Sequence, residues 1–209
     1  VFVAVSCFCL SCGDKPMSVS GGDFIPIQSG NVMLAAELDL PPGEGPFPAM
    51  VFVHGSGEIT RHQYAGASKW LASQGIAMLR YDKRGAGQST GRYRDVNAGN
   101  SAALFEILAD DVIAAVAFLK NHPRIDARQI GLYGTSQAGW IMPLAAARSN
   151  DVAFTISISG AASSVGISDY YDSIAERGWS EEQIAAALEN FNGTHGFDPA
   201  PYLERLTVP

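Results

Sequence analysis

A serine between a strand-like run and a helix-like run is the first candidate for chemistry in this sequence. The apolar run Ile130–Tyr133 favours a strand that ends at Gly134, and an Ala-rich segment typical of a helix follows Ser136. Such a turn holds a serine hydroxyl above the sheet and places unpaired helix N–H groups beside it. Small residues are needed two positions before and after the serine, and Gly134 and Ala138 occupy these places, with Gly139 adding room. The pattern indicates a nucleophile, although an ordinary loop with Ser136 as a helix N-cap would read the same way.

Two other loops carry residue types that suit a reaction site. H-G-S-G at 54–57 follows the apolar run A-M-V-F-V, and D-K-R-G-A-G-Q-S at 82–89 follows I-A-M-L-R-Y. In an open α/β sheet, the loops at the carboxyl ends of parallel strands lie at the edge where ligands bind. The Gly-rich loop at 85–91 could also suggest phosphate binding, but it precedes no helix start with a lysine in place, so a P-loop is not favoured.

The elements around these loops predict a mostly parallel sheet flanked by helices. Strand patterns on either side of Ser29–Asn31 predict an antiparallel hairpin, and helices are expected at about 64–74 and 100–121. The run V-A-F-T-I-S-I-S at 152–159 is expected to be another buried strand. Short helices are expected at 169–178, 180–190 and 201–206, with Ser180 as an N-cap.

Three motifs in this order between these elements make the chain resemble an α/β-hydrolase. The resemblance runs from about Asp23 to Pro209 and is to the small serine hydrolases related to dienelactone hydrolases and serine aminopeptidases. It implies that Ser136 is the nucleophile and that the backbone N–H groups of Gln137 and Ser56 form the oxyanion hole. No metal or cofactor motif stands out.

Other residues of the three motifs are expected to support the site. The resemblance implies that His54 supports the oxyanion loop and does not transfer protons. Gly55 and Gly57 would let this loop approach the substrate closely. Asp82 and Arg84 are interpreted as a charged pair with each other that braces the loop under Ser136.

The general base and its orienting acid are the missing part of the constellation. In this fold they follow the serine in the order acid, histidine. Downstream of Ser136 the sequence has one histidine, His195, and the aspartates Asp151, Asp169, Asp172 and Asp198. The resemblance implies that both catalytic groups lie beyond Pro209, so His195 is expected on the surface or in a lid, with a catalytic role as the minority alternative. The final strands of the fold are expected to be missing, and the fragment to be nearly inactive.

The predicted organisation has three parts. Residues 1–22 are interpreted as a partial leader and linker, 23–165 as the hydrolase core, and 166–209 as a helical cap insertion that leads into a next, absent strand. The first twelve residues are apolar or small and suit a signal peptide without its basic start. L-S-C-G resembles a bacterial lipoprotein cleavage site with Cys12 as the lipidation candidate, which predicts an exported protein of the cell envelope or a secreted form.

Composition narrows the functional classes without fixing a substrate. The chain has 209 residues, of which 47% are hydrophobic and 17% charged, with a net charge of −7. This charge argues against nucleic acid or an anionic membrane surface as the partner. It does not indicate an oligomeric state.

Three functions remain open on the sequence. The leading one is hydrolysis of small or medium carboxylic esters. A serine peptidase of the same fold is the first alternative, and a non-catalytic binding protein is the second. The substrate pocket is expected to be shaped by the cap, whose aromatic residues either line it or pack the cap onto the core: Tyr170, Tyr171, Trp179 and Phe191.

Overall fold

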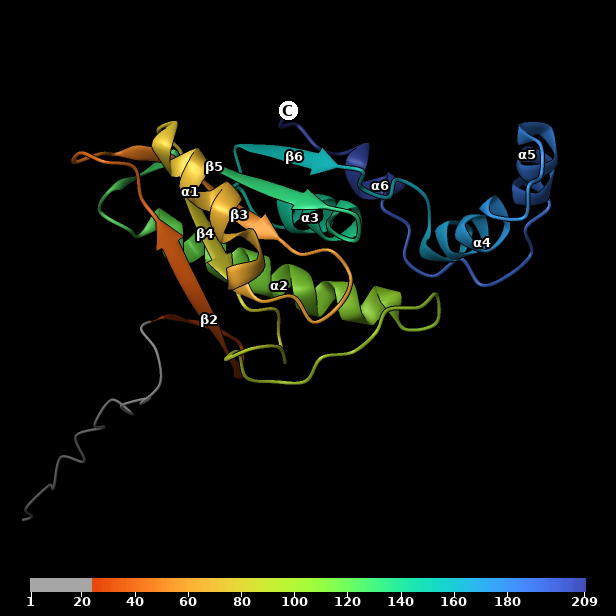
Figure 1. Cartoon of the computed structure of the whole chain (residues 1–209), viewed down its shortest axis with the longest axis horizontal. Coiled ribbons are helices and arrows are strands. Elements are labelled where there is room, and N and C mark those ends of the chain that lie inside the picture. Colours follow the sequence, from red (N-terminus) through yellow and green to blue (C-terminus); the bar gives the residue numbers. More distant parts are fainter. Residues whose placement is uncertain (1–23) are drawn as a thin grey trace, which may run out of the picture.

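The computed structural model describes residues 24–209, so the predicted leader and Cys12 lie outside the described residues. Six strands form one sheet in the order β1-β2-β4-β3-β5-β6 (Figure 1). β1 and β2 form the predicted antiparallel hairpin, β2 is also antiparallel to β4, and the strands from β4 to β6 run parallel. The predicted α/β fold with a mostly parallel sheet is therefore confirmed. The strands are β1 (Ile25–Ser29), β2 (Val32–Asp39), β3 (Phe47–Val53), β4 (Ala77–Tyr81), β5 (Ile125–Thr135) and β6 (Phe154–Ile158).

Helices cover both faces of this sheet and extend beyond one end of it (Figure 1). The long helix α2 matches its predicted bounds to within one residue at each end. The helices are η1 (Arg61–Tyr64), α1 (Ala65–Ser73), α2 (Ser101–Lys120), α3 (Ala138–Ala147), α4 (Val165–Ala175), α5 (Glu181–Glu189) and α6 (Ala200–Leu203). In the described part of the chain, none of them is long and apolar enough to cross a membrane.

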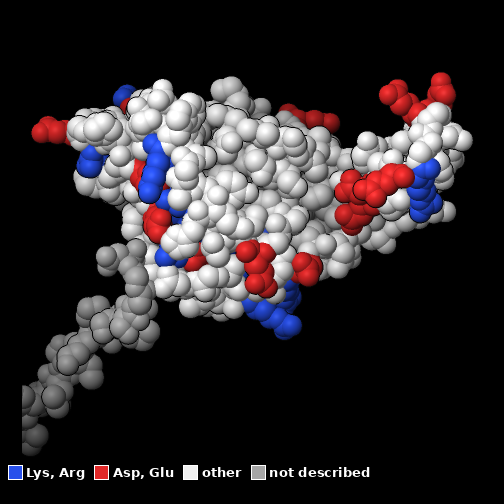
Figure 2. Space-filling view, in the orientation of Figure 1, with Lys and Arg blue, Asp and Glu red and all other residues white. Residues whose placement is uncertain are grey.

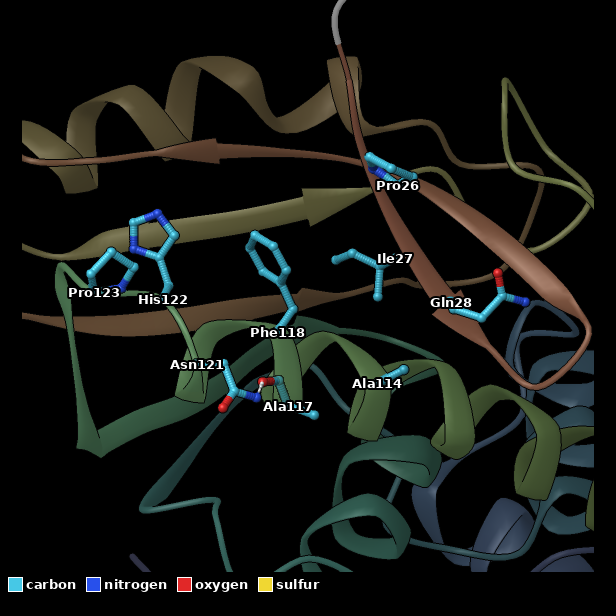
Figure 3. Close-up of a pocket in the computed structure, with 9 residues that line it drawn as sticks. All are labelled: Pro26, Ile27, Gln28, Ala114, Ala117, Phe118, Asn121, His122 and Pro123. Carbon is cyan, nitrogen blue, oxygen red and sulfur yellow. Dashed lines mark hydrogen bonds between the residues drawn. The ribbon is translucent and has the colours of Figure 1, made fainter. Parts of the chain in front are cut away.

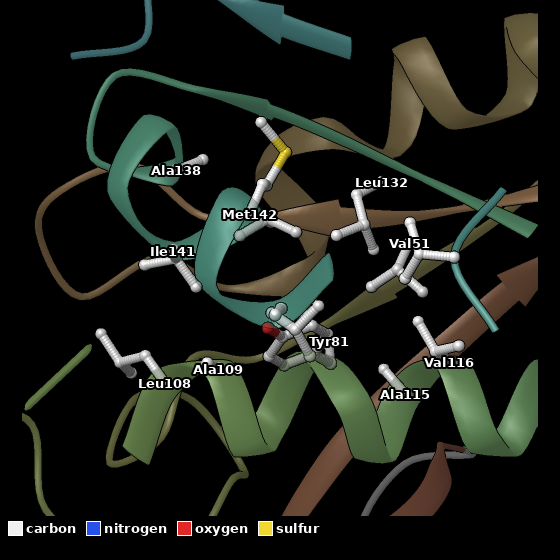
Figure 4. Close-up of a cluster of buried hydrophobic side chains, with 14 of the residues drawn as sticks. Val51, Tyr81, Leu108, Ala109, Ala115, Val116, Leu132, Ala138, Ile141 and Met142 are labelled. Atoms are coloured by element: carbon white, nitrogen blue, oxygen red, sulfur yellow. The ribbon is translucent and has the colours of Figure 1, made fainter. Parts of the chain in front are cut away.

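Successive side chains of β3 point to opposite faces of the sheet, so they belong to two separate parts of the hydrophobic core. Val51 and Val53 belong to the large cluster that includes α2 and α3, whereas Met50 and Phe52 belong to a smaller cluster on the other face. The smaller cluster is covered by Tyr64 and the α1 region. Figure 4 shows part of the large cluster, with side chains of α2 and α3 facing those of the sheet. Because both faces are covered, the central strands are apolar throughout, as expected for buried parallel strands.

The prediction that residues 152–159 contain a strand is confirmed, but the prediction that this strand is buried is wrong. β6 pairs with β5 on one side and is the last strand in the order of the described sheet. Ile156 and Ile158 are 42% and 45% exposed. On its other side, the Thr155 N–H donates to the Pro209 carbonyl at 2.8 Å. The apolar run is thus a true strand, but only a cover on both faces would bury it.

Helices α4 and α5 form an arm that projects from the sheet (Figure 1). α4 begins at Val165, four residues before the predicted start; Ser164 precedes it at the N-cap position, and Val165 is buried. α5 begins as predicted: the Ser180 Oγ accepts from the Gln183 N–H, and the Gln183 side chain accepts from the Ser180 N–H. α6 is shorter than predicted. Acidic side chains gather over this arm, as Figure 2 shows.

Candidate active site

Ser136 lies on the turn between β5 and α3, in a strained backbone conformation. Its φ angle is +54°, in the left-handed region that non-glycine residues rarely occupy. The Ser136 N–H donates to the Ile158 carbonyl at 3.2 Å, and its own carbonyl accepts from the Gly139 N–H at 2.8 Å. These two bonds hold the turn between the ends of β5 and β6 and the start of α3. Gln137 is the N-cap residue of α3, so its N–H is among those without an intrahelical acceptor.

The small residues around Ser136 are required by close packing. A methyl group at position 134 would lie 2.5 Å from the Ala138 Cβ and 2.8 Å from the Val53 carbonyl oxygen. One at position 139 would lie 2.5 Å from the Ala161 nitrogen. Distances this short are forbidden contacts, so strand and helix converge only because these positions are small. The local geometry is the tight strand-to-helix turn that the spacing predicts.

The H-G-S-G loop lies directly beside this turn. A methyl group on Gly55 would be in ordinary contact with Thr135 and Ser136, at 3.5–3.7 Å. Gly57 has a φ of +95°, which favours glycine. The side-chain Nε2 of Gln137 donates to the Ser56 Oγ at 3.4 Å. Ser56, Ser136 and Gln137 therefore come together, and all three line one cavity of about 370 Å³.

His54 does not face this cavity as a proton-transfer group. It is buried, and its Nε2 lies 2.7 Å from the Tyr81 carbonyl oxygen, to which a neutral imidazole donates. Burial, with the nearby charge of Lys83, lowers the pKa of His54 to about 3. The neutral ring ties the H-G-S-G loop to the end of β4, which agrees with a supporting role.

The predicted pairing of Asp82 with Arg84 is wrong. The Asp82 carboxylate pairs instead with Arg61, at 2.5 Å from its Nη1, and accepts from the Arg61 and Gln88 N–H groups at 2.8 and 2.7 Å. Arg84 forms a two-pronged pair with Asp111 of α2, at 2.5 and 3.0 Å. Side chains two residues apart in this loop point to different elements. Each braces the loop as expected, but through a partner distant in sequence.

Lys83 is a site residue that the sequence analysis missed. Its Nζ donates to the Gly55 carbonyl at 2.8 Å and to the Gln137 Oε1 at 2.7 Å. The side chain is 3% exposed, and burial lowers the pKa of Lys83 to about 8. Its position between Asp82 and Arg84, at the carboxyl end of β4, was the available signal. Lys83 thus joins the H-G-S-G loop to the residue that follows Ser136.

All four histidines of the chain lie within the described residues, and none of them is hydrogen-bonded to Ser136 there. His195 pairs with Ser164, 3.1 Å from its Oγ, and packs edge-on against Phe191. The His62 Nδ1 lies 3.6 Å from the Glu37 Oε1, and the His122 Nδ1 accepts from the Arg124 N–H. His195 is exposed in the cap region, as expected of a surface or lid residue.

The arm contributes polar groups and one aromatic residue to the cavity. Of the four predicted aromatics, Tyr171 lines it, whereas Tyr170 packs on Phe191 at 5.2 Å. Asp169 and Asp172 also line it. Burial and the neighbouring Asp172 raise the pKa of Asp169 above its ordinary value. The cavity thus has Ser136 at one side and two carboxylates from α4 at another.

A second hollow, of about 520 Å³, lies between β1 and the C-terminal half of α2 (Figure 3). Ile27, Ala114 and Phe118 make much of its wall, and it shares no lining residue with the cavity at Ser136. Although larger, it contains no serine among its lining residues. Within residues 24–209, no group of three His, Cys, Asp or Glu side chains could hold a metal ion.

Curated relatives of this chain include an esterase and coenzyme A thioesterases, and also polyketide transferases. It is 31% identical over 138 residues to a peroxisomal succinyl-coenzyme A thioesterase of Mus musculus, covering 66% of this chain and 29% of the relative. It is 32% identical over 123 residues to esterase EstD of Thermotoga maritima, covering 56% and 28%. The chain therefore matches less than a third of the length of either protein.

Solved structures share the fold, and a family model matches most of the chain. An esterase of Pyrococcus furiosus superposes with a TM-score of 0.63 at 18% identity, over 90% of this chain and 67% of that one. The α/β hydrolase GrgF from Penicillium gives 0.58 at 24% identity, over 90% and 67%. The family described as X-Pro dipeptidyl-peptidase (S15 family) matches residues 29–195. Because this match covers well over half of the chain, the protein belongs to the S15 family, within the α/β-hydrolase superfamily of serine hydrolases.

Proposed function

We propose that the complete protein is a serine hydrolase that cleaves carboxylic esters of small or medium acyl groups through an acyl-enzyme on Ser136. The observation that carries this proposal is the left-handed backbone of Ser136, at φ +54°, at the head of α3. Strain of this kind persists only where the surroundings enforce it. Here the packing around positions 134 and 139 leaves no room for a side chain larger than that of glycine. Ser159 has a similar φ of +49°, but only Ser136 combines this strain with the Gly134–Gly139 spacing and the head of α3, which supports a chemical role for Ser136.

The chemistry would divide between the turn and the H-G-S-G loop. The Ser136 Oγ attacks the acyl carbon, and the carbonyl electrons move onto oxygen as the new C–O bond forms. The Gln137 and Ser56 N–H groups would donate to that oxygen. Removing one such donor costs about 3 kcal/mol of transition-state stabilisation in a measured case. Collapse expels the alcohol, and water then hydrolyses the acyl-enzyme.

A base is needed to take the Ser136 proton, and we infer that it comes from residues outside this sequence. The support is that His54, His62, His122 and His195 all have partners elsewhere. We expect an acid and a histidine, in that order along the chain, to complete the site. Without them, the 209-residue chain would retain only ~10³–10⁴-fold acceleration over water, from binding and the oxyanion hole.

The decisive experiment is labelling of the complete protein with a fluorophosphonate probe, followed by peptide mass spectrometry. The expected adduct is on Ser136, and it disappears in the S136A variant. A matched control is S164A, because Ser164 is the serine that pairs with His195. Labelling of S164A should persist. An unlabelled wild-type protein, or an adduct on Ser164, would contradict the proposal.

A peptidase or aminoacyl hydrolase is the second candidate, favoured by one observation. Asp169 and Asp172 line the cavity that contains Ser136, and carboxylates there would attract the ammonium group of a free amino terminus. The description of the matched family, X-Pro dipeptidyl-peptidase, agrees with this alternative. Comparing dipeptidyl and aminoacyl p-nitroanilides with p-nitrophenyl acyl esters separates the two functions. Faster cleavage of the anilides would replace the ester proposal.

A further inference from the structure

Lys83 is buried beside the proposed oxyanion hole without lining its cavity. Its ammonium group contacts two acceptors, the Gly55 carbonyl at 2.8 Å and the Gln137 Oε1 at 2.7 Å. Cavity-lining residues from these two segments include Ser56 and Gln137, but not Lys83. A buried lysine is costly unless its charge has partners, so a purely apolar side chain would be the simpler choice for packing. Lys83 has two such partners, and both belong to the segments that carry the proposed donors.

The two acceptors are linked covalently to the two proposed donors. The Gly55 carbonyl belongs to the same peptide unit as the Ser56 N–H, and the Gln137 side chain belongs to the residue whose own N–H is the other donor. In a planar trans peptide the carbonyl and the N–H point in opposite directions. Lys83, which holds the Gly55 oxygen, therefore directs the Ser56 N–H away from itself. An acceptor bonded to a cation also makes the N–H of its own peptide a better donor, because successive hydrogen bonds polarise one another.

We propose that Lys83 is the positioning residue of the oxyanion hole: it fixes both donor segments from behind and polarises the Ser56 N–H through the Gly55 carbonyl. The proposal rests on the function proposed above, since it assigns Lys83 a part in that reaction. Lys83 touches neither the serine nor the cavity, so it acts through Gly55 and Gln137. The same ammonium ties the H-G-S-G loop to the turn after β5, so that the two donors keep one relative position.

The surroundings of Lys83 give this role a pH dependence. Burial lowers the pKa of Lys83 to about 8, while Asp95 opposes the shift. The groups that face it are His54, which is neutral, the Tyr93 ring at 5.6 Å from Nζ, and Asp95, which accepts from the Tyr93 hydroxyl. The cation is present below pH 8 and is lost above it. The turnover number should therefore fall as the pH rises through about 8, whereas a histidine base gains activity as the pH rises.

The test compares K83M with K69M in the complete protein, using a neutral p-nitrophenyl ester. Methionine keeps most of the length of lysine without the charge, and Lys69 is an exposed lysine of α1 that serves as the matched control. For K83M we expect kcat to fall about 10- to 100-fold, less than the loss of a whole donor, with KM within about twofold. The rate of fluorophosphonate labelling should fall in parallel. K69M should match the wild type.

The pH profile separates this role from simple packing. In the wild type, kcat should fall through about pH 8, and K83M should lack this fall. An unchanged kcat in K83M, or the same alkaline fall in both proteins, would overturn the inference. If K83M does not fold, the pH profile of the wild-type kcat decides. A wild-type kcat that stays level up to pH 9.5 would overturn the inference about Lys83. A wild-type protein with no esterase activity and no label on Ser136 would instead contradict the proposed function itself.

Discussion

The sheet and the α4–α5 arm reach the same cavity but are built in opposite ways. β3 and β4 are buried along nearly their whole length, and the loops after them are held by buried ion pairs such as Arg61 with Asp82. α4 buries three residues, and α5 buries none. Segments with few buried contacts open at low free-energy cost, whereas the centre of a packed sheet opens only with global unfolding.

This difference matches what each side of the cavity would have to do. Ser136, Gln137 and Ser56 need fixed geometry, because a reaction tolerates displacements of only fractions of an ångström. They come from the sheet and from loops at its edge. Tyr171, Asp169 and the other arm residues face the rest of the cavity, where contacts can differ between substrates. We expect the sheet to set the rate of the chemical step and the arm to set substrate preference.

The largest effect is expected on the sheet side, from S136A. Loss of the nucleophile should lower kcat of the complete protein by about 10⁴- to 10⁶-fold for any ester, because no acyl-enzyme forms. The substitution removes one hydroxyl, and the melting temperature should stay near that of the wild type. Steady-state kinetics with p-nitrophenyl acetate and a thermal melt measure both. A loss of less than tenfold would show that another residue carries the reaction.

A methyl group at position 134 should give the next largest effect. In G134A the new Cβ would lie 2.5 Å from the Ala138 Cβ, so strand and helix must separate and Ser136 must shift. We expect about 10²-fold lower kcat, as for a displacement near 1 Å, and about 1–3 kcal/mol lower unfolding free energy. Denaturant unfolding and ester kinetics measure these changes.

G66A is the matched control for this prediction. Gly66 lies in α1, and a methyl group there would meet nothing within 4 Å. Because alanine is the better helix former, G66A should equal the wild type in kcat and be up to about 1 kcal/mol more stable. If G134A behaved like G66A, close packing under Ser136 would not be what fixes the turn.

Local patterns explain which parts of the sheet could be predicted. Three features depend on residues that lie close together in the sequence: the hairpin, the Gly134–Gly139 turn and the bounds of α2. Hydrophobic periodicity and glycine spacing indicate such local contacts. The cap at Ser180 was predictable for the same reason, since its partner Gln183 is three residues away.

Long-range partners explain the rest. Asp82 pairs with Arg61 across 21 positions, and Arg84 with Asp111 across 27, so adjacency in D-K-R suggested a pair that the loop geometry does not form. Lys83 acts through Gly55 and Gln137, which are 28 and 54 positions away. The exposure of β6 depends on what lies beside it in the sheet. The five residues of β6 carry no pattern that indicates these neighbours. The expected final strands and the lipidated Cys12 stay predictions.

On the arm side, we expect Asp169→Asn with Asp172→Asn to change substrate preference and leave the chemical step intact. For an aminoacyl p-nitroanilide, KM should rise about 5- to 10-fold, because two partly solvated carboxylates no longer attract the ammonium group. For p-nitrophenyl acetate, kcat and KM should stay within about twofold. The control is E181Q with E182Q, which neutralises two exposed acids of the same arm in α5. Equal effects from both double variants would indicate a general field and not a specific contact.

The same pair predicts a pH dependence for cationic substrates. The pKa of Asp169 is raised by burial and by Asp172, so its charge appears at a higher pH than that of a free aspartate. KM for a cationic substrate should therefore be high at low pH, where the carboxyl group is protonated, and should fall as the pH rises through this raised pKa. KM for a neutral ester should not follow this course. Parallel pH profiles for the two substrates would rule out Asp169 as the group responsible.

The smallest effect is expected from S180A, which tests whether the arm is independent of the sheet. The substitution removes the Oγ that accepts from the Gln183 N–H at 3.3 Å, and loss of an N-cap costs about 1 kcal/mol of local helix stability. Because α5 buries no residue, this cost should stay within the arm: hydrogen exchange of α5 amides should speed up about fivefold, while β3 and β5 amides keep their protection. The kcat for a neutral ester should be unchanged. If S180A also lowered protection in the sheet or slowed ester hydrolysis, arm and sheet would open as one unit. The sheet would then not set the rate independently of an arm that sets substrate preference.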